Sequence, residues 1–372
     1  MKINTLQGVD LIQELKKTPF YNIHVNLGAK MVDFAGFSMP VQYDSIIKEH
    51  EAVRSKAGVF DVSHMGEFLL EGEDVVDFLQ YVMINDLNLL EPSKGQYSCM
   101  CYDNGTVVDD LVYYEENPNR FRMIVNAGNV EKDYQWLNEH IGNRDVKITN
   151  LSSERSRLAF QGPKSDEYLQ PLMDVDLNSV NRFYFARGNL NNTPIFIART
   201  GYTGESGFEL SFDNAFAEKI WSDLIQTGAS PAGLGARDSL RLEATYSLYG
   251  HEINDSITPV EAGLFWLVKP KEGIDYIGKK ILLEQKTHGT ERIIVGLNLL
   301  ERGIIRENFK IFKENVEIGY VTSGGYSPTL KKTIALGLIK KQYKEVGTKL
   351  EIQVRNKNLK GIVVSTPFFR NV

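Results

Sequence analysis

The sequence predicts a mixed α+β body followed by a small all-β barrel or sandwich. In most of the chain, short β-like segments alternate with segments whose apolar residues recur at helical spacing. From about residue 291 the pattern changes to short strand-like segments separated by Gly, Asn and Lys turns. A length of 372 residues is enough for two or three domains. We therefore expect at least two units of different architecture.

The expected elements begin with a short amphipathic helix from Thr5 to Lys17, which ends before Thr18 and Pro19. The body then continues with a strand at 34–43, a helix at 45–58, a strand region at 60–72, a helix at 74–83, strands at 104–114 and 121–129, a helix at 130–141, two strands within 194–212, and helices at 216–228 and within 231–253. The C-terminal unit has expected strands at 293–299, 316–324, 333–339, 348–354 and 360–365. No repeat with a period of about 20 to 50 residues is clear.

Composition excludes several classes of protein. No apolar run approaches the roughly 18 residues of a membrane span, and a net charge of -6 argues against a nucleic-acid-binding protein. Cys99 and Cys101 are the two cysteines, spaced C-x-C, and they indicate neither a zinc site nor a disulfide framework. The N-terminus has no apolar signal core, and its Asp10 and Glu14 argue against a transit peptide. A reducing compartment, the cytoplasm, is the expected location.

An acidic pair, Asp109 and Asp110, lies inside the strand predicted at 104–114. Neither acid has an all-polar face, because side chains alternate across a strand: Asp110 is grouped with Val108, Val112 and Tyr114, and Asp109 with Val107, Leu111 and Tyr113. One carboxylate is therefore expected to project into an apolar interior or cleft, a setting that tunes it for acid, base or electrostatic work. An edge strand with both acids in solvent is the alternative, and the strand alone does not decide between them.

A glycine-rich loop joins two strands in RTGYTGESGFEL, residues 199–210. The loop lacks the G-x-x-x-x-G-K-[ST] pattern and opens no helix, so it is not a phosphate-binding loop. Its outgoing strand carries Glu209 between Phe208 and Leu210. A carboxylate has two acceptor oxygens and matches a ligand edge with two adjacent N–H donors, such as that of a pterin. A glutamate that faces solvent is the plainer interpretation.

The helix within 231–253 carries Arg237, Asp238 and Arg241 in its first turns. The two arginines share a face and could hold a carboxylate or a polar ring, although a surface ion pair between Asp238 and Arg241 explains the pattern as well. The six histidines show no metal-ligand spacing, so we expect no metal site. No serine lies in a G-x-S-x-G elbow.

Taken together, several segments resemble the aminomethyltransferase of the glycine cleavage system, the T-protein. FDVSHMGE and RTGYTGE are the most distinctive of them, and the resemblance runs from about Thr18 to Arg370. The matching segments are, in order, LGAKMVDFAGFSMPVQY (27–43), GVFDVSHMGEF (58–68), VVDDLVYY (107–114), IVNAGNVEKD (124–133), AFQGPKS (159–165), RTGYTGESGFEL (199–210), GLGARDSLRLEA (233–244), SGGYSPTL (323–330) and PFFR (367–370). Where the family often has a second glycine before the acid pair, this chain has Thr106.

The resemblance implies a two-lobed folate-binding α+β body and a C-terminal β-barrel, arranged around a central channel. The implied domains are an N-terminal extension (1–17), the folate-binding aminomethyltransferase domain (18–290) and the barrel (291–372). The family's essential aspartate falls on Asp110. Its pterin-recognising glutamate falls on Glu209. The other implied folate-pocket residues are Arg237, Tyr202, Met65, Tyr97, Asn126 and Arg370.

The implied reaction moves a one-carbon unit from the S-aminomethyl-dihydrolipoyl arm of H-protein to tetrahydrofolate. Ammonia, 5,10-methylenetetrahydrofolate and the dihydrolipoyl arm are the products. Tetrahydrofolate is thus a co-substrate and lipoylated H-protein a partner, and neither nucleic acid nor membrane is involved. Lys340, Lys341 and Lys344 are a candidate basic surface for an acidic carrier, although a solvated lysine cluster is the simpler interpretation.

Other folate proteins are alternatives. A tetrahydrofolate-dependent demethylase of a small methylated compound would use the same pocket. A non-catalytic accessory protein of iron–sulfur maturation would carry a K-G-C-Y-x-G-Q motif, which this chain lacks. The folate domain of a dimethylglycine or sarcosine oxidising enzyme would accompany a flavin domain, and no G-x-G-x-x-G opens a helix here. The retained Asp110 disfavours a protein that only binds folate.

Overall fold

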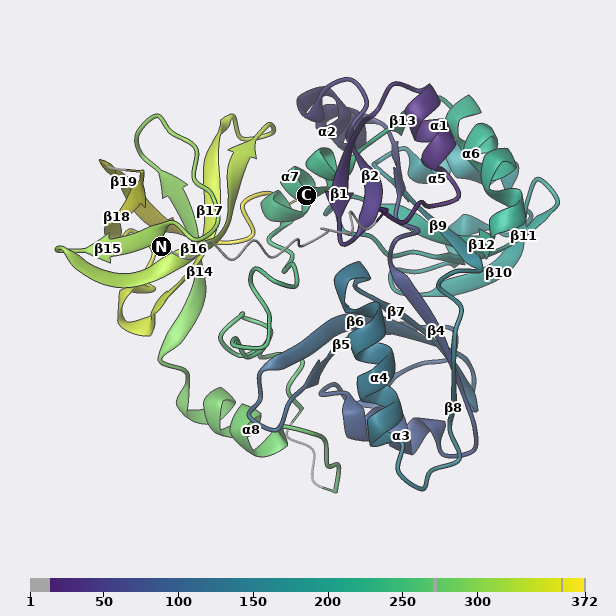
Figure 1. The fold of residues 1–372 in the computed structure, drawn as a ribbon, viewed down its shortest axis with the longest axis horizontal. Coiled ribbons are helices and arrows are strands. Elements are labelled where there is room, and N and C mark those ends of the chain that lie inside the picture. The colour runs from purple at the N-terminus through teal and green to yellow at the C-terminus, as the bar shows by residue number, and fades with distance from the viewer. Residues whose placement is uncertain (1–13, 270–272, 356, 371–372) are drawn as a thin grey trace, which may run out of the picture.

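The computed structural model describes residues 14–269, 273–355 and 357–370. Two larger open sheets, each accompanied by helices, and one closed barrel make up the fold. Figure 1 shows the barrel on one side of the molecule and the two sheets, one above the other, on the opposite side. The predicted α+β fold class and the C-terminal barrel are therefore confirmed, whereas the central channel and the domain boundaries stay predictions. Within the described part, no helix is long and apolar enough to cross a membrane.

The lower sheet in Figure 1 carries the acidic pair and has the strand order β5-β6-β7-β4-β8. Its strands are β4 (Gly66–Glu71), β5 (Gly95–Cys101), β6 (Val107–Asn117), β7 (Arg120–Val125) and β8 (Lys147–Asn150). Helices α3 (Val75–Val82) and α4 (Val130–His140) accompany this sheet. Their apolar faces bury Leu79 and Leu137 in one core with Met123 of β7, as the helical periodicity predicts.

The upper sheet carries Glu209 and has the order β10-β11-β12-β9-β3-β13. Its strands are β3 (Gly58–Asp61), β9 (Arg155–Gln161), β10 (Phe185–Leu190), β11 (Thr193–Ala198), β12 (Gly207–Asp213) and β13 (Ser230–Pro231). Helices α5 (Ser165–Leu169) and α6 (Ala217–Gln226) accompany the sheet. Leu169, Ile220 and Leu224 from these helices pack with Phe208 and Leu210 of β12.

The N-terminal part adds helices α1 (Tyr21–Asn26) and α2 (Ile46–Ser55) and a hairpin of β1 (Lys30–Phe34) and β2 (Phe37–Gln42). Most of the helix predicted from Thr5 to Lys17 lies outside the described residues. Its last four residues are not helical, and Lys16 forms an isolated bridge with Phe37.

The elements of the two larger sheets follow one another along the chain in a similar order, although in the upper sheet β3 lies between β9 and the last strand. In each sheet the chain forms, in order, a strand, a helix, one or two 3₁₀ turns, three strands, a second helix and a last strand. Gln80 accepts a hydrogen bond from the backbone N–H of Leu87 at 2.9 Å, and Gln170 accepts the equivalent bond from Leu177 at 2.8 Å. This similar order of elements indicates an internal duplication. Its period is longer than the roughly 20 to 50 residues of the repeats sought in the sequence.

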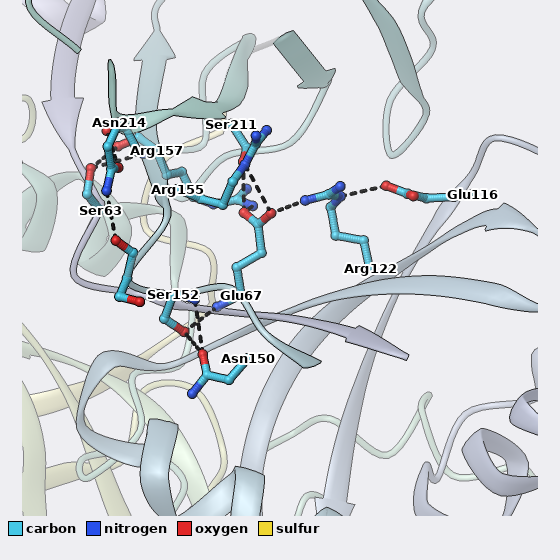
Figure 2. A network of polar contacts seen from close by, with 12 residues as sticks. Ser63, Glu67, Glu116, Arg122, Asn150, Ser152, Arg155, Arg157, Ser211 and Asn214 are labelled. Carbon is cyan, nitrogen blue, oxygen red and sulfur yellow. Dashed lines mark hydrogen bonds and ion pairs between the residues drawn. The ribbon is translucent and has the colours of Figure 1, made fainter. Parts of the chain in front are cut away.

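A buried ionic network joins the two sheets (Figure 2). Glu67 of β4, 2% exposed, accepts from Arg157 Nη2 of β9 at 2.8 Å and from Ser211 Oγ of β12 at 2.8 Å. Arg122 of β7 also contacts Glu67 and donates its Nε to Glu116 at 2.6 Å. Removing one partner from such a network leaves a buried charge uncompensated, so the sheets are held in one relative position.

The barrel closes in the order β14-β17-β16-β15-β18-β19. Its strands are β14 (Arg292–Leu299), β15 (Lys310–Lys313), β16 (Val316–Ser327), β17 (Lys332–Lys340), β18 (Lys349–Val354) and β19 (Lys357–Val364), and α8 (Lys279–His288) precedes it. Helix α7 (Leu234–Ala244) packs against β16 and β17. Arg241 of α7 donates to Ser323 Oγ of β16 at 2.8 Å and to Glu252 at 2.9 Å. The barrel is thus attached through the helix that carries Arg237.

Candidate active site

Asp110 lies on β6 with two hydrogen-bond donors on its carboxyl group. The Tyr97 hydroxyl donates to Oδ2 at 2.8 Å, and Asn126 Nδ2 donates to Oδ1 at 2.8 Å. Burial, followed by the nearby Asp109 carboxylate, raises the pKa of Asp110 to about 7. A carboxyl group with this pKa exchanges a proton readily at neutral pH. The structure therefore brings three of the predicted site residues into one cluster.

The predicted grouping of side chains on this strand is wrong at one end. A β-bulge leaves Val108 without a pairing partner on β5. Val108 consequently packs in the core that contains Leu111, on the side away from Asp110. Val107 takes its place and packs with Cys99, which pairs with Asp110. An extra residue in a strand reverses the alternation that the sequence pattern assumes.

Glu209 of β12 is half-buried, and its two oxygens have different surroundings. Thr200 Oγ1 donates to Oε2 at 2.6 Å, and the Tyr114 hydroxyl lies 3.2 Å from the same Thr200 oxygen. No described residue donates a hydrogen bond to Oε1. Glu209 thus keeps an acceptor for a ligand donor.

Arg237 lies beside Tyr202, with its guanidinium carbon 4.7 Å from the ring centroid. Burial lowers the pKa of Arg237, and the charge of Glu209 partly offsets that effect. Its Nη1 is buried and has no hydrogen-bond partner in the described chain. The Tyr202 ring stacks on Tyr246 with centroids 5.9 Å apart, and its hydroxyl donates to the Ser247 carbonyl. Arg237 therefore has a free donor in an otherwise ordered setting.

Met65 and Tyr97 also lie close to these groups, whereas Arg370 does not contact them. Met65 packs against the cluster formed by Tyr114 and its neighbours, and the Tyr97 ring stacks on Trp266 with centroids 6.1 Å apart. Arg370 is exposed and has no hydrogen bond or ion pair with the described residues. Its place in the pocket stays a prediction.

The pair of Arg237 and Arg241 divides into two roles. Arg241 does pair with Asp238, whose Oδ1 accepts from its Nε at 2.8 Å. Arg241 is 1% exposed, however, so the surface ion pair considered from the sequence is wrong for this residue. A single helical turn thus carries one arginine that joins the barrel and one that keeps a free donor.

Two comparisons of sequence decide the family. The family model "GCVT N-terminal domain" matches residues 20–272, and the model "Glycine cleavage T-protein C-terminal barrel domain" matches residues 292–370. The chain belongs to the glycine cleavage T-protein family. An aminomethyltransferase of Geobacillus sp. (strain WCH70) is 46% identical over 361 residues, which cover 96% of this chain and 99% of that protein. One of Bacillus mycoides (strain KBAB4) is 47% identical over 361 residues, covering 96% and 98%.

A solved structure agrees with this assignment. The crystal structure of the glycine cleavage system aminomethyltransferase T from Bartonella henselae superposes with a TM-score of 0.90 at 34% identity, covering 95% of this chain and 98% of that one. The T-protein resemblance read from the sequence motifs is confirmed, and so are the enzyme class and the aminomethyltransferase function predicted with it. Nothing in these matches supports the demethylase or accessory alternatives.

The sequence analysis did not predict several residues that lie around the candidate active site. Thr200 orients Glu209, and its place beside Gly201 in the RTGYTGE motif was a usable signal. His64 is buried beside Arg237, and burial lowers its pKa to about 4, so the imidazole is neutral near pH 7. Trp266 stacks on Tyr97 although it is 48% exposed, and no motif marked it. These residues act through contacts between segments far apart in the chain.

Proposed function

We propose that Asp110 is the catalytic carboxylate of a reaction that moves the one-carbon unit from the S-aminomethyl-dihydrolipoyl arm of H-protein to tetrahydrofolate. The observation that supports this most is a half-buried carboxyl group with a pKa of about 7, held by Tyr97 and Asn126. The family and the full-length aminomethyltransferase relatives supply the reaction. Folate as co-substrate and lipoylated H-protein as partner follow from that family. A cytoplasmic location stays a prediction.

The residues present fit a folate. Glu209 Oε1 lacks a donor among the described residues, and the buried Nη1 of Arg237 lacks an acceptor. A pterin edge offers N–H donors to the carboxylate and a carbonyl oxygen to the guanidinium, so both groups would gain their missing partner. Asp110 also influences the pKa of Tyr202, which lies against Arg237. Tyr202 therefore links the proposed pterin end of the site to Asp110.

The proposed chemistry needs a proton acceptor beside the folate nitrogens. The aminomethyl carbon loses its bonds to nitrogen and sulfur and gains bonds to folate N5 and N10. The two folate N–H protons end on the departing ammonia and thiolate, which balances the reaction. Asp110 accepts a proton as a folate nitrogen attacks and stabilises the positive charge that develops there. Holding the reactants in line supplies much of the remaining rate.

Reconstitution tests the function. H-protein charged with the aminomethyl group, tetrahydrofolate and this chain are mixed, and ammonia release is followed against a control without the protein. We expect Asp110→Asn to keep its folate affinity and to lose turnover by roughly a hundredfold or more. Asp103→Asn, an exposed aspartate of the turn that precedes β6, is the matched control. Near-normal turnover of Asp110→Asn contradicts the catalytic role, and no acceleration by the unaltered protein favours the demethylase or accessory alternatives.

A further inference from the structure

Two fully buried carboxyl groups lie behind Asp110. Asp109 of β6 and Asp133 of α4 are both 0% exposed. Asp109 accepts three hydrogen bonds from N–H donors: from the backbone of Asn126 at 3.1 Å, from Asn126 Nδ2 at 2.9 Å and from Asn129 Nδ2 at 2.6 Å. Three such donors stabilise the ionised form of a carboxyl group. We therefore treat Asp109 as a carboxylate.

Asp133 has the opposite environment. Neither of its oxygens receives a hydrogen bond from an N–H or hydroxyl donor of the described residues. Burial, and then the charge of Asp109, raises the pKa of Asp133 to about 11. Two adjacent buried carboxyl groups do not both ionise. The Asp133 carboxyl consequently keeps its proton, and its interaction with the Asp109 side chain contributes to the raised pKa.

One side-chain amide connects this pair to the proposed catalytic group. Asn126 Nδ2 donates to Asp109 Oδ1 at 2.9 Å and to Asp110 Oδ1 at 2.8 Å. The amide is also held by the Asp110 carbonyl at 3.0 Å. Because Asp109 binds both the backbone and the side chain of Asn126, it fixes the amide that orients Asp110. Its negative charge also favours the protonated form of Asp110.

We propose that Asp109 is a positioning residue for Asp110, acting through the side-chain amide of Asn126, and that the protonated carboxyl of Asp133 allows it to stay ionised in the protein interior. This proposal rests on the proposed function of Asp110. Without Asp109, the Asn126 amide is held only by Asp110 itself, and Asp110 loses both a fixed donor and its charged neighbour. Without a proton on Asp133, two fully buried carboxylates would repel each other.

The tyrosines and the thiol around the pair do not titrate near neutrality. Burial raises the pKa values of the neighbouring tyrosines and of the thiol on β5, so these groups are neutral where Asp110 titrates; they are Tyr97, Cys99, Tyr202 and Tyr249. Lys132 of α4 also lies close to the pair, and burial lowers the pKa of its ammonium while the charges of Asp133 and Asp109 oppose that effect. Its Nζ donates to the Val108 carbonyl and, at 2.9 Å, to the Tyr249 hydroxyl, away from Asp110. The neighbouring tyrosines and the thiol therefore add no charge in the pH range where Asp110 titrates.

Carbon NMR of the full chain, labelled at the aspartate carboxyl carbons, tests the proposal without folate or H-protein. Resonances are assigned with Asp110→Asn and Asp133→Asn. In the unaltered protein we expect one aspartate, Asp133, to stay protonated at about pH 8 and Asp110 to titrate near neutrality. Asp109→Asn removes a like charge, which lowers the midpoint of Asp110, and loosens the Asn126 donor, which raises it; the charge is the larger effect, so we expect a net fall of about one pH unit. Asp133→Asn, whose amide replaces the shared proton donor, should shift that midpoint by less than about 0.3 units.

The outcomes separate this proposal from the catalytic role of Asp110. An Asp110 midpoint and a kcat that both stay unchanged in Asp109→Asn overturn the positioning role, whatever Asp110→Asn does to turnover. If every aspartate is ionised at about pH 8 in the unaltered protein, the proton on Asp133 is refuted, and this measurement stands even where Asp109→Asn fails to fold. In turnover, Asp109→Asn should lower kcat more than it changes KM for folate and move the acid limb of the pH profile by the same amount as the midpoint. Asp103→Asn serves as the unchanged control.

Discussion

The chemistry of Asp110 depends on residues that are not its neighbours in the sequence. The strand pattern indicates that an acid enters an apolar setting, and the structure fully buries Asp109, whereas Asp110 is half-buried. It does not indicate Tyr97 and Asn126 as donors, because both lie on other strands or loops. The bulge at Val108 was equally hidden, since a bulge depends on how two strands pair and not on the alternation within one.

The pKa of Asp110 predicts the pH dependence of the reaction. A carboxylate that accepts a proton is active only when ionised, so kcat/KM should rise with pH through about 7, the pKa of Asp110. Below that midpoint the slope should approach a tenfold loss per pH unit, roughly as one ionisation requires. The profile is measured with tetrahydrofolate below saturation. A flat profile between about pH 6 and 8 would contradict the role.

Glu209 is expected to contribute to folate affinity and not to turnover. Glu209→Gln keeps the size of the side chain but replaces a charge-assisted hydrogen bond with a neutral one, at a cost of roughly 1.5 to 3 kcal/mol in binding. Isothermal titration with tetrahydrofolate measures the change directly. Glu205→Gln, in the same loop, is unsuitable as a control because Glu205 pairs with Arg54. Asp213→Asn at the exposed end of β12 is suitable, and unchanged affinity of Glu209→Gln would remove it from the pocket.

At the scale of elements, periodicity was a good guide to helices and strands and a poor guide to their pairing. The helices predicted at 45–58, 74–83, 130–141 and 216–228 correspond to α2, α3, α4 and α6. The sheet order was not predictable, because β3 pairs with β9, far along the chain, and with β13. Pairing over such separations depends on tertiary packing, which local patterns do not contain.

The duplicated design predicts a shared need for glycine. Gly72 and Gly162 follow equivalent strands, β4 and β9, with φ of +145° and +140°. A Cβ on Gly162 would lie 2.3 Å from the Lys56 carbonyl oxygen, and one on Gly72 would lie 1.9 Å from that of Asp145. Gly162→Ala should therefore destabilise the protein by roughly 2 to 4 kcal/mol, through strain at φ and through a clash with backbone.

A matched variant separates strain from clash. Gly228 also has positive φ, +91°, but a Cβ there meets no atom within 4 Å. Gly228→Ala should cost only about 1 kcal/mol. Urea unfolding of both variants measures the difference, and equal costs would show that the close approach to Lys56 is relieved by movement of the chain.

At the scale of the whole molecule, the candidate site is assembled from separate parts. Asp110 comes from the lower sheet, Glu209 from the upper sheet, and Arg237 from the helix that meets the barrel. The buried Glu67 network holds the two sheets together, and Arg241 holds the barrel (Figures 1 and 2). From the local sequence, each of these residues had a functional interpretation and a simpler structural one. Only the resemblance to the T-protein family assigned all three to one pocket. Their assembly depends on contacts between distant segments.

The attachment of the barrel predicts how stability and folate affinity are linked. Arg241→Met leaves the Glu252 carboxylate, 1% exposed, without its cation. An uncompensated buried charge costs roughly 3 to 5 kcal/mol, so the urea midpoint should fall. Arg237 lies one turn earlier on the same helix. A shift of α7 after the loss of Arg241 would move Arg237 as well, so KM for folate should rise together with the loss of stability.

A second substitution, at Glu252, tests whether the uncompensated charge of its carboxylate causes the loss of stability. Glu252→Gln in the Arg241→Met background removes the stranded carboxylate while an amide oxygen still accepts from Thr322 Oγ1, which donates to Glu252 at 2.6 Å in the native protein. We expect the double variant to regain more than about half of the lost stability, since coupled neighbours are not additive. Recovery of stability without recovery of KM would show that Arg241 positions α7 by its own hydrogen bond to Ser323. Additive losses in the double variant would contradict a buried pair, because two independent contacts would then have been removed.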